Sequence, residues 1–190
     1  MEFWAVLIMF ICLCVDNMVM ANMSAMKSQN NNVRSSLSLR IALTFSIFHA
    51  LFLLAGYLIA YIWPAQYSWT ASVWISFAFV MLIGIRLLLE TVEKSPSFGI
   101  DDPEMNPKLI KTGMLLALNS AMLGFALQIM SVNYSLVWPL FALFAVSMIM
   151  SLLGFLFGRP DSKRISSKVV ESVAGIVMIV LAIRILIMYR

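Results

Sequence analysis

Three polar side chains interrupt long apolar stretches of this chain and could together bind a metal ion. Asp16 lies near the middle of the apolar stretch 3–24. His49 and Asn119 lie deep within two further stretches of the same kind. A charge in the hydrocarbon core of a membrane costs about 2.5–3.5 kcal/mol on insertion scales, so such a residue is a candidate for function. A carboxylate oxygen, an imidazole nitrogen and an amide oxygen suit a borderline divalent cation such as manganese, zinc or iron.

The surrounding residues favour binding over catalysis, and each candidate also has a purely structural interpretation. No nucleophile and base stand at a spacing typical of an enzyme, and no cofactor is expected. Asp16 could be protonated or paired with Arg86 or Arg184. His49 could bridge two helices through a hydrogen bond, and Asn119 could do the same, because polar side chains often join helices in membranes.

Four further residues are predicted to support the site. Asn17 directly follows Asp16. Arg86 and Glu90 stand four positions apart, on one face of a helix, where an ion pair is expected. Arg184 lies near the end of the last apolar stretch, from which its long side chain can reach the membrane surface.

Composition identifies an integral membrane protein. Hydrophobic residues make up 62% of the chain and charged residues 12%, and the mean hydropathy is +0.95. Soluble domains contain about 45–50% apolar and about 25% charged residues. A helix needs about 20 apolar residues to cross a bilayer, and six segments are long enough. These predicted spans are 3–24, 38–63, 69–91, 109–130, 136–158 and 169–189.

The distribution of Lys and Arg predicts the orientation. On one side of the membrane, the connections and helix ends collect Lys27, Arg34, Arg40, Lys94, Lys108, Lys111, Arg159, Lys163, Arg164 and Lys168. The other side carries only Arg190. Because positive charge accumulates on the cytoplasmic side, both termini are predicted to lie outside the cytoplasm. The net charge of +4 is therefore interpreted as a topology signal rather than as a sign of nucleic-acid binding.

The two halves of the chain resemble each other, which predicts an internal repeat. The segment 84–88 matches 182–186, and 54–58 matches 152–156, both at a separation of 98 residues. In the first and fourth spans, 15–17 aligns with 118–120. Chance similarity between apolar sequences is the alternative, although chance does not explain the equal spacing of the Gly and Arg positions.

A repeat of three helices places its second copy upside down in the membrane. The expected organisation is a first unit at 1–95, a cytoplasmic linker at 96–108 and a second unit at 109–190. The fold predicted is therefore an all-α membrane protein of six helices, built as two inverted three-helix repeats. Transporters with such repeats bind their substrate near the membrane midplane, between the repeats.

Depth supports a shared site. At a rise of about 1.5 Å per residue, Asp16, His49 and Asn119 each lie roughly 15–20 Å from a membrane surface. We therefore expect the three side chains to meet near the midplane, at the interface of the two units.

The residues resemble the MntP-type manganese efflux pumps of bacterial inner membranes over nearly the whole chain. The resemblance is carried by the length, the six spans and the Asp in the first span, by Gly84-Ile85-Arg86 with Glu90, and by 149–154 with Gly158. It implies efflux of manganese from the cytoplasm across the inner membrane, coupled to an ion gradient. The family typically has acids where this chain has His49 and Asn119, so the resemblance implies the fold more firmly than the metal.

Three functions remain open on the sequence alone. The first is export of a divalent cation, with manganese as the first candidate. The second is export of a small organic solute such as an amino acid, with Asp16 carrying a proton. The third is a membrane subunit that has kept the helices and lost transport.

Overall fold

The computed structural model describes residues 3–27, 31–62, 69–92, 106–130, 137–158 and 167–189. All regular structure in these ranges is helical, and six stretches are long and apolar enough to cross a membrane. The prediction of an all-α protein with six spans is confirmed. The helices are α1 (Phe3–Leu13), α2 (Val15–Lys27), α3 (Asn31–Ile62), α4 (Trp69–Val92), α5 (Asn106–Ile129), α6 (Val137–Phe157) and α7 (Ser167–Tyr189).

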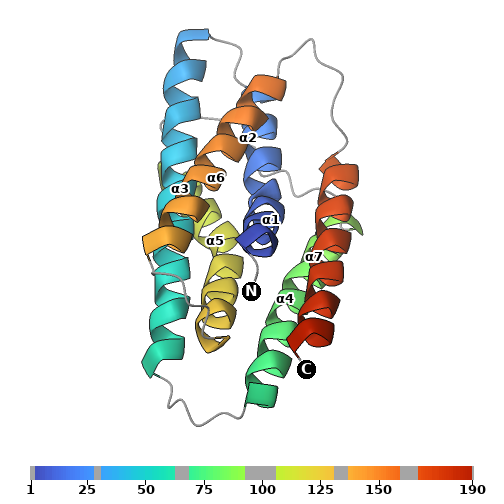
Figure 1. Cartoon of the computed structure of the whole chain (residues 1–190). Helices are drawn as coiled ribbons and strands as arrows, with labels where there is room; N and C mark the ends of the chain where they lie inside the picture. Colours follow the sequence, from blue (N-terminus) through green and yellow to red (C-terminus); the bar gives the residue numbers. More distant parts are fainter. Residues whose placement is uncertain are drawn as a thin grey trace.

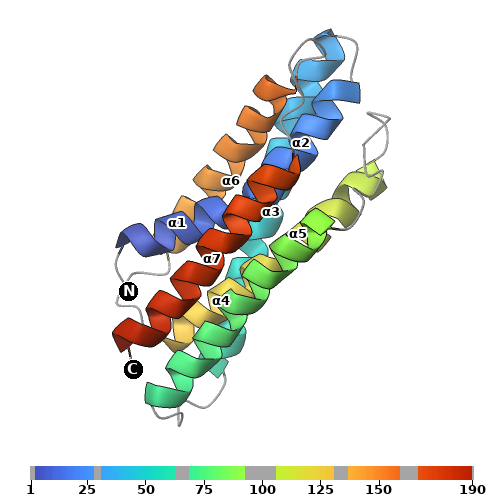
Figure 2. The same cartoon turned by 90° about the vertical axis from the view of Figure 1, so that its right-hand side faces the viewer.

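The first span is not one helix, which corrects the sequence-based prediction for 3–24. It is interrupted at Cys14, between α1 and α2. The Cys14 N–H donates to two carbonyls at once, Phe10 at 3.0 Å and Ile11 at 3.2 Å. This shared hydrogen bond tightens the last turn of α1. The axes of α1 and α2 meet at a clear angle (Figure 2).

The other predicted spans agree with the helices to within a few residues, except at the start of α3. This helix begins at Asn31, whereas the prediction began at 38. Its polar first turns continue the helix beyond the apolar part, which runs from Ser36 to Ile62. Most of the predicted linker 96–108 lies outside the described residues, and α5 already begins at Asn106.

Four pairs of helices make most of the packing. Helix α3 packs along α5, α4 along α7, and α6 against both α2 and α3. Figure 1 shows α4 and α7 side by side, with α3 and α6 on the other side of the bundle. The start of α1 and the end of α7 lie close to each other.

Glycines allow two of these pairs to approach closely. A Cβ on Gly56 of α3 would overlap the carbonyl oxygen of Ala121 in α5, and one on Gly124 would overlap that of Leu53. A Cβ on Gly154 of α6 would likewise overlap the carbonyl oxygen of Met18 in α2. Small residues at helix crossings let backbones come into contact, which is how membrane helices gain packing energy without a hydrophobic driving force.

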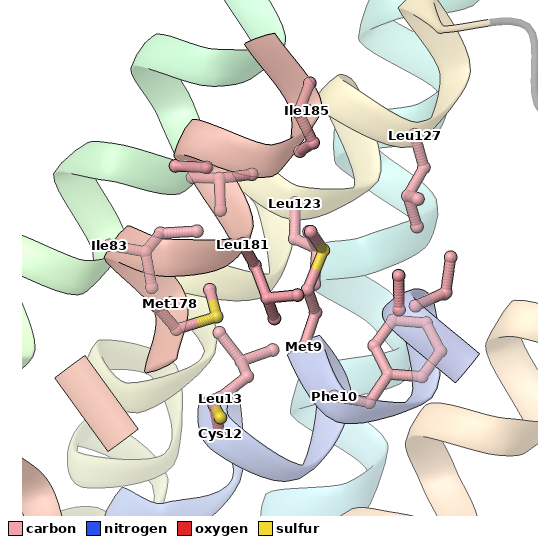
Figure 3. Close-up of a cluster of buried hydrophobic side chains, with 14 of the residues drawn as sticks. Met9, Phe10, Cys12, Leu13, Ile83, Leu123, Leu127, Met178, Leu181 and Ile185 are labelled. Atoms are coloured by element: carbon pink, nitrogen blue, oxygen red, sulfur yellow. The ribbon is translucent and has the colours of Figure 1, made fainter. Parts of the chain in front are cut away.

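An apolar cluster fills the space between α1 and the helices around it (Figure 3). Its members from α1 and the adjoining turn pack against side chains of α4, α5 and α7. The labelled residues are Met9, Phe10, Cys12, Leu13, Ile83, Leu123, Leu127, Met178, Leu181 and Ile185. Leu13 belongs to this cluster and stands three residues before Asp16, so the cluster adjoins the position of the buried acid.

Candidate polar site between the helices

Asp16 lies in the first turn of α2, directly after the break at Cys14. Its side chain is 8% exposed, and it is the one charged side chain that is buried among the described residues. The first turn of a helix carries a partial positive charge that stabilises a nearby carboxylate. The break therefore gives the acid a favourable position within a span that the sequence alone presents as uniform.

His49 is the centre of a buried hydrogen-bond network. Its Nε2 lies 3.0 Å from Oδ1 of Asn17, and its Nδ1 contacts Oγ of Ser120. Asn17 in turn donates from Nδ2 to Oγ of Ser147 at 2.8 Å. These four side chains come from α3, α2, α5 and α6, and all are fully buried. One continuous chain of side-chain contacts thus joins four of the six spans.

The network is extended by one more hydroxyl. Ser46, one turn before His49, donates to the carbonyl oxygen of Ala42 at 2.7 Å. Its Oγ also lies 3.3 Å from Oγ of Ser147. Ser46 therefore joins α3 to α6 directly.

A neutral ring with its proton on Nε2 satisfies both hydrogen bonds of His49. An amide oxygen only accepts hydrogen bonds, so Nε2 donates to Asn17 and carries the proton. Neutral imidazole has one donor nitrogen, so Nδ1 accepts from the Ser120 hydroxyl. In this arrangement the ring is neutral and both of its nitrogens are engaged, so His49 can bind a cation only after giving up one of these contacts.

Asn119, the neighbour of Ser120, makes a different contact. Its Oδ1 accepts a hydrogen bond of 2.8 Å from Nη1 of Arg86 in α4. Its Nδ2 is buried and has no hydrogen-bond partner. A buried donor without an acceptor costs about 1–3 kcal/mol, so this group marks a place where an acceptor is missing.

The contacts around the site follow the spacing of the sequence repeat. Ser147 lies 98 positions after His49, and Ser120 lies 103 positions after Asn17. The pair Asn17–Ser147 is thus the repeat counterpart of the pair Ser120–His49. The helix crossings show the same relation, because Met18 with Gly154 corresponds to Ala121 with Gly56.

The structure brings together some of the predicted site residues. Asn17 and His49 are in direct contact, and Arg86 reaches Asn119. Arg184 is exposed and its Nε lies 3.2 Å from Sδ of Met188. The predicted pair of Arg86 with Glu90 cannot be followed, because the side chain of Glu90 lies outside the described residues.

The predicted ligand set of Asp16, His49 and Asn119 stays a prediction. Among the described residues, no three His, Cys, Asp or Glu side chains stand close enough together to hold a metal ion. The donors gathered around His49 are neutral amide and hydroxyl groups.

Ser46, Ser120 and Ser147 were not among the predicted site residues. Ser120 was part of the aligned segment 118–120, but no role was assigned to it. Applying the repeat separation of 98 to His49 leads directly to Ser147, so this residue could have been found.

Comparisons with known proteins identify the family. A family model described as "Putative manganese efflux pump" (Mntp) matches residues 32–186. The chain belongs to this family. Two curated relatives carry the name "Putative manganese efflux pump MntP". The one from Serratia proteamaculans is 26% identical over 154 residues, covering 78% of this chain and 77% of the relative. The one from Actinobacillus succinogenes is 29% identical over 156 residues, covering 80% of each.

The family match supports the resemblance identified in the sequence, with one restriction. It begins at residue 32, so α1 and α2, with Asp16 and Asn17, lie before the matched segment. No solved structure gives a significant match to the chain. Any role of Asp16 and Asn17 is therefore supported by their positions in the structure and not by the family match.

Proposed function

We propose that this protein exports a divalent metal cation, with manganese as the first candidate, across a bacterial inner membrane. The family match over residues 32–186 supports transport of a metal. The observation that supports a site within this chain is the position of Asp16, a buried acid adjoining a polar network that links four spans. In this proposal the protein works as a transporter and not as an enzyme, with both termini outside the cytoplasm.

The proposed ligands are Asp16, His49 and Asn119. Asp16 supplies the negative charge. An amide oxygen has two lone pairs, so Oδ1 of Asn119 can keep Arg86 on one and offer the other to a cation. His49 becomes a ligand when one of its hydrogen bonds opens, and this exchange couples cation binding to the packing of the helices around it.

Metal content of cells tests the proposal. We expect expression of the intact chain in a manganese-sensitive bacterial strain to lower cell-associated manganese, measured by mass spectrometry. Asp16→Asn keeps the size of the side chain and removes its charge, and it should abolish the effect. Glu171→Gln is the matched control, because Glu171 is a half-buried acid on α7 outside the proposed ligand set, and it should leave the metal content as low as the intact chain does.

The same cells are grown with zinc, iron or cadmium to identify the metal. If the cellular content of one of these metals falls and that of manganese does not, the cargo is that metal and the proposed mechanism still holds. Unchanged content of all four metals with a well-expressed intact protein would contradict metal export.

A further inference from the structure

The contact between Arg86 and Asn119 contains an unfilled place for a hydrogen-bond acceptor. Asn119 is 1% exposed, its Oδ1 accepts from Arg86, and its Nδ2 has no partner. Rotating the amide by half a turn does not resolve this, because the guanidinium only donates and would then face the NH₂ group. No described group supplies the acceptor, so a bound molecule can take this place.

The charges of the site also favour a negatively charged partner for a bound cation. Asp16 is the one buried charge among the described side chains, and half-buried Arg86 has the opposite sign. The two charges are equal in size and opposite in sign, and the groups bonded around His49 are neutral. A bare divalent cation would add two positive charges that these side chains do not offset, and uncompensated charge is strongly disfavoured in the membrane interior.

We propose that Arg86 and Asn119 bind a small oxyanion, a carboxylate or a phosphate, which accompanies the cation through the protein. The proposal rests on the proposed export of a divalent cation and adds a second component to the cargo. An oxyanion has several acceptor oxygens, so one can accept from Nδ2 of Asn119 while another accepts from the guanidinium of Arg86. Charge-assisted bonds of guanidinium to carboxylate or phosphate are among the strongest that proteins make.

The oxyanion and the cation would occupy adjoining places on the same amide. Asn119 would offer its oxygen to the cation and its nitrogen to the anion. The negative charge of the anion would then lower the cost of moving the cation across the apolar interior. The cargo becomes close to neutral without a second acid from the protein.

Direct binding of an anion tests the site without metal. The purified full-length protein in detergent is titrated with ¹⁴C-labelled malonate and, separately, with labelled inorganic phosphate, which distinguishes the two sources of oxyanion. We expect saturable binding of one of them. We expect roughly tenfold weaker binding in Arg86→Gln and in Asn119→Asp, the scale of losing one charge-assisted hydrogen bond. Lys111→Gln, which removes an exposed cation of α5, should bind as the unmodified protein does.

Transport tests whether the anion accompanies the cation. Proteoliposomes of the full chain are loaded with manganese chloride, alone or with malonate or phosphate, at the same free manganese concentration. We expect manganese release to rise roughly tenfold with the effective oxyanion, and labelled anion to leave together with the metal. Asn119→Asp supplies a negative charge from the protein itself, so its manganese release should no longer depend on the anion.

The two experiments separate the possible failures. Measurable manganese release that is equal with and without both oxyanions, or binding of neither anion, would overturn the oxyanion site. Binding of an anion that depends on Arg86 and Asn119, without manganese release under any condition, would support the oxyanion site and contradict metal export.

Discussion

At the scale of single residues, neutral side chains around His49 satisfy one another's hydrogen bonds. His49 has both ring nitrogens engaged, and Asn17 uses its oxygen for His49 and its nitrogen for Ser147. The position of His49 deep in a span was visible in the sequence, but its two hydrogen-bond partners come from two other helices and depend on their rotation. Hydropathy finds the depth of a residue and not its direction around the helix axis. The sequence therefore gives an expected depth for His49, and it cannot give the contacts of the ring.

Removing one hydroxyl from this network should destabilise the protein measurably. Ser147→Ala leaves Nδ2 of Asn17 buried without its acceptor. We expect the free energy of unfolding to fall by about 0.5–2 kcal/mol, within the range for hydrogen bonds between membrane helices and for buried unpaired donors. Unfolding of the purified protein in detergent, followed by tryptophan fluorescence, measures the change.

Ser151→Ala is the matched control for this change. Ser151 lies one turn further along α6 and is equally buried, but its hydroxyl donates at 2.9 Å to the carbonyl oxygen of Ser147 in its own helix. That carbonyl keeps its helical bond when the hydroxyl is removed, so the change should stay within about 0.5 kcal/mol. Equal losses in both variants would show that the contact between Asn17 and Ser147 adds no stability.

At the scale of elements, the site is positioned by one broken span and by close crossings of the others. The break at Cys14 could not be predicted from Pro or Gly, because the segment 11–17 contains neither. The sequence therefore predicts a continuous helix, and the interruption depends on the tertiary packing of α1. Phe3 and Phe10 of α1 lie with ring centroids 4.7 and 6.4 Å from that of Trp138 in α6, which shows where this half-span is anchored.

The crossing of α3 and α5 should not tolerate a side chain at its centre. In Gly56→Ala the added methyl group would meet the backbone of Ala121, which can move only if the two helices separate. We expect a loss of about 1–3 kcal/mol, typical of overpacking, together with less protein recovered in the monodisperse peak on size-exclusion chromatography. Ala55→Val enlarges the preceding residue, which is exposed on the outside of the bundle. It should behave like the unmodified chain, and a similar loss in both variants would contradict a close crossing at Gly56.

At the scale of the whole molecule, the packed helix pairs stay the same when each helix is replaced by its repeat counterpart in the other half of the chain. Packing of the first span on α6 corresponds to packing of α5 on α3, and α3 with α6 and α4 with α7 each correspond to themselves. The sequence indicated this relation through its equal separations, because apolar residues, Gly and Arg recur at matching depths. The sequence could not predict the hydrogen bonds at equivalent positions of the two halves. Ser147 stands at the position equivalent to His49, so the two halves carry different side chains there.

An inverted repeat requires equivalent connections of the two halves to face opposite sides of the membrane, and cysteine labelling can test this. Positions 65 and 163 are 98 residues apart, in the connections after the second and fifth spans. A single cysteine introduced by Ala65→Cys should react in intact cells with a maleimide that cannot cross the membrane. Lys163→Cys should react only after the cells are permeabilised, because its loop is rich in the positive charges that remain in the cytoplasm. The native Cys12 and Cys14 are buried and should contribute little background. Labelling of both introduced cysteines from the same side would mean that the halves are not inverted, and the paired contacts of Asn17 with Ser147 and of Ser120 with His49 would then need a different origin.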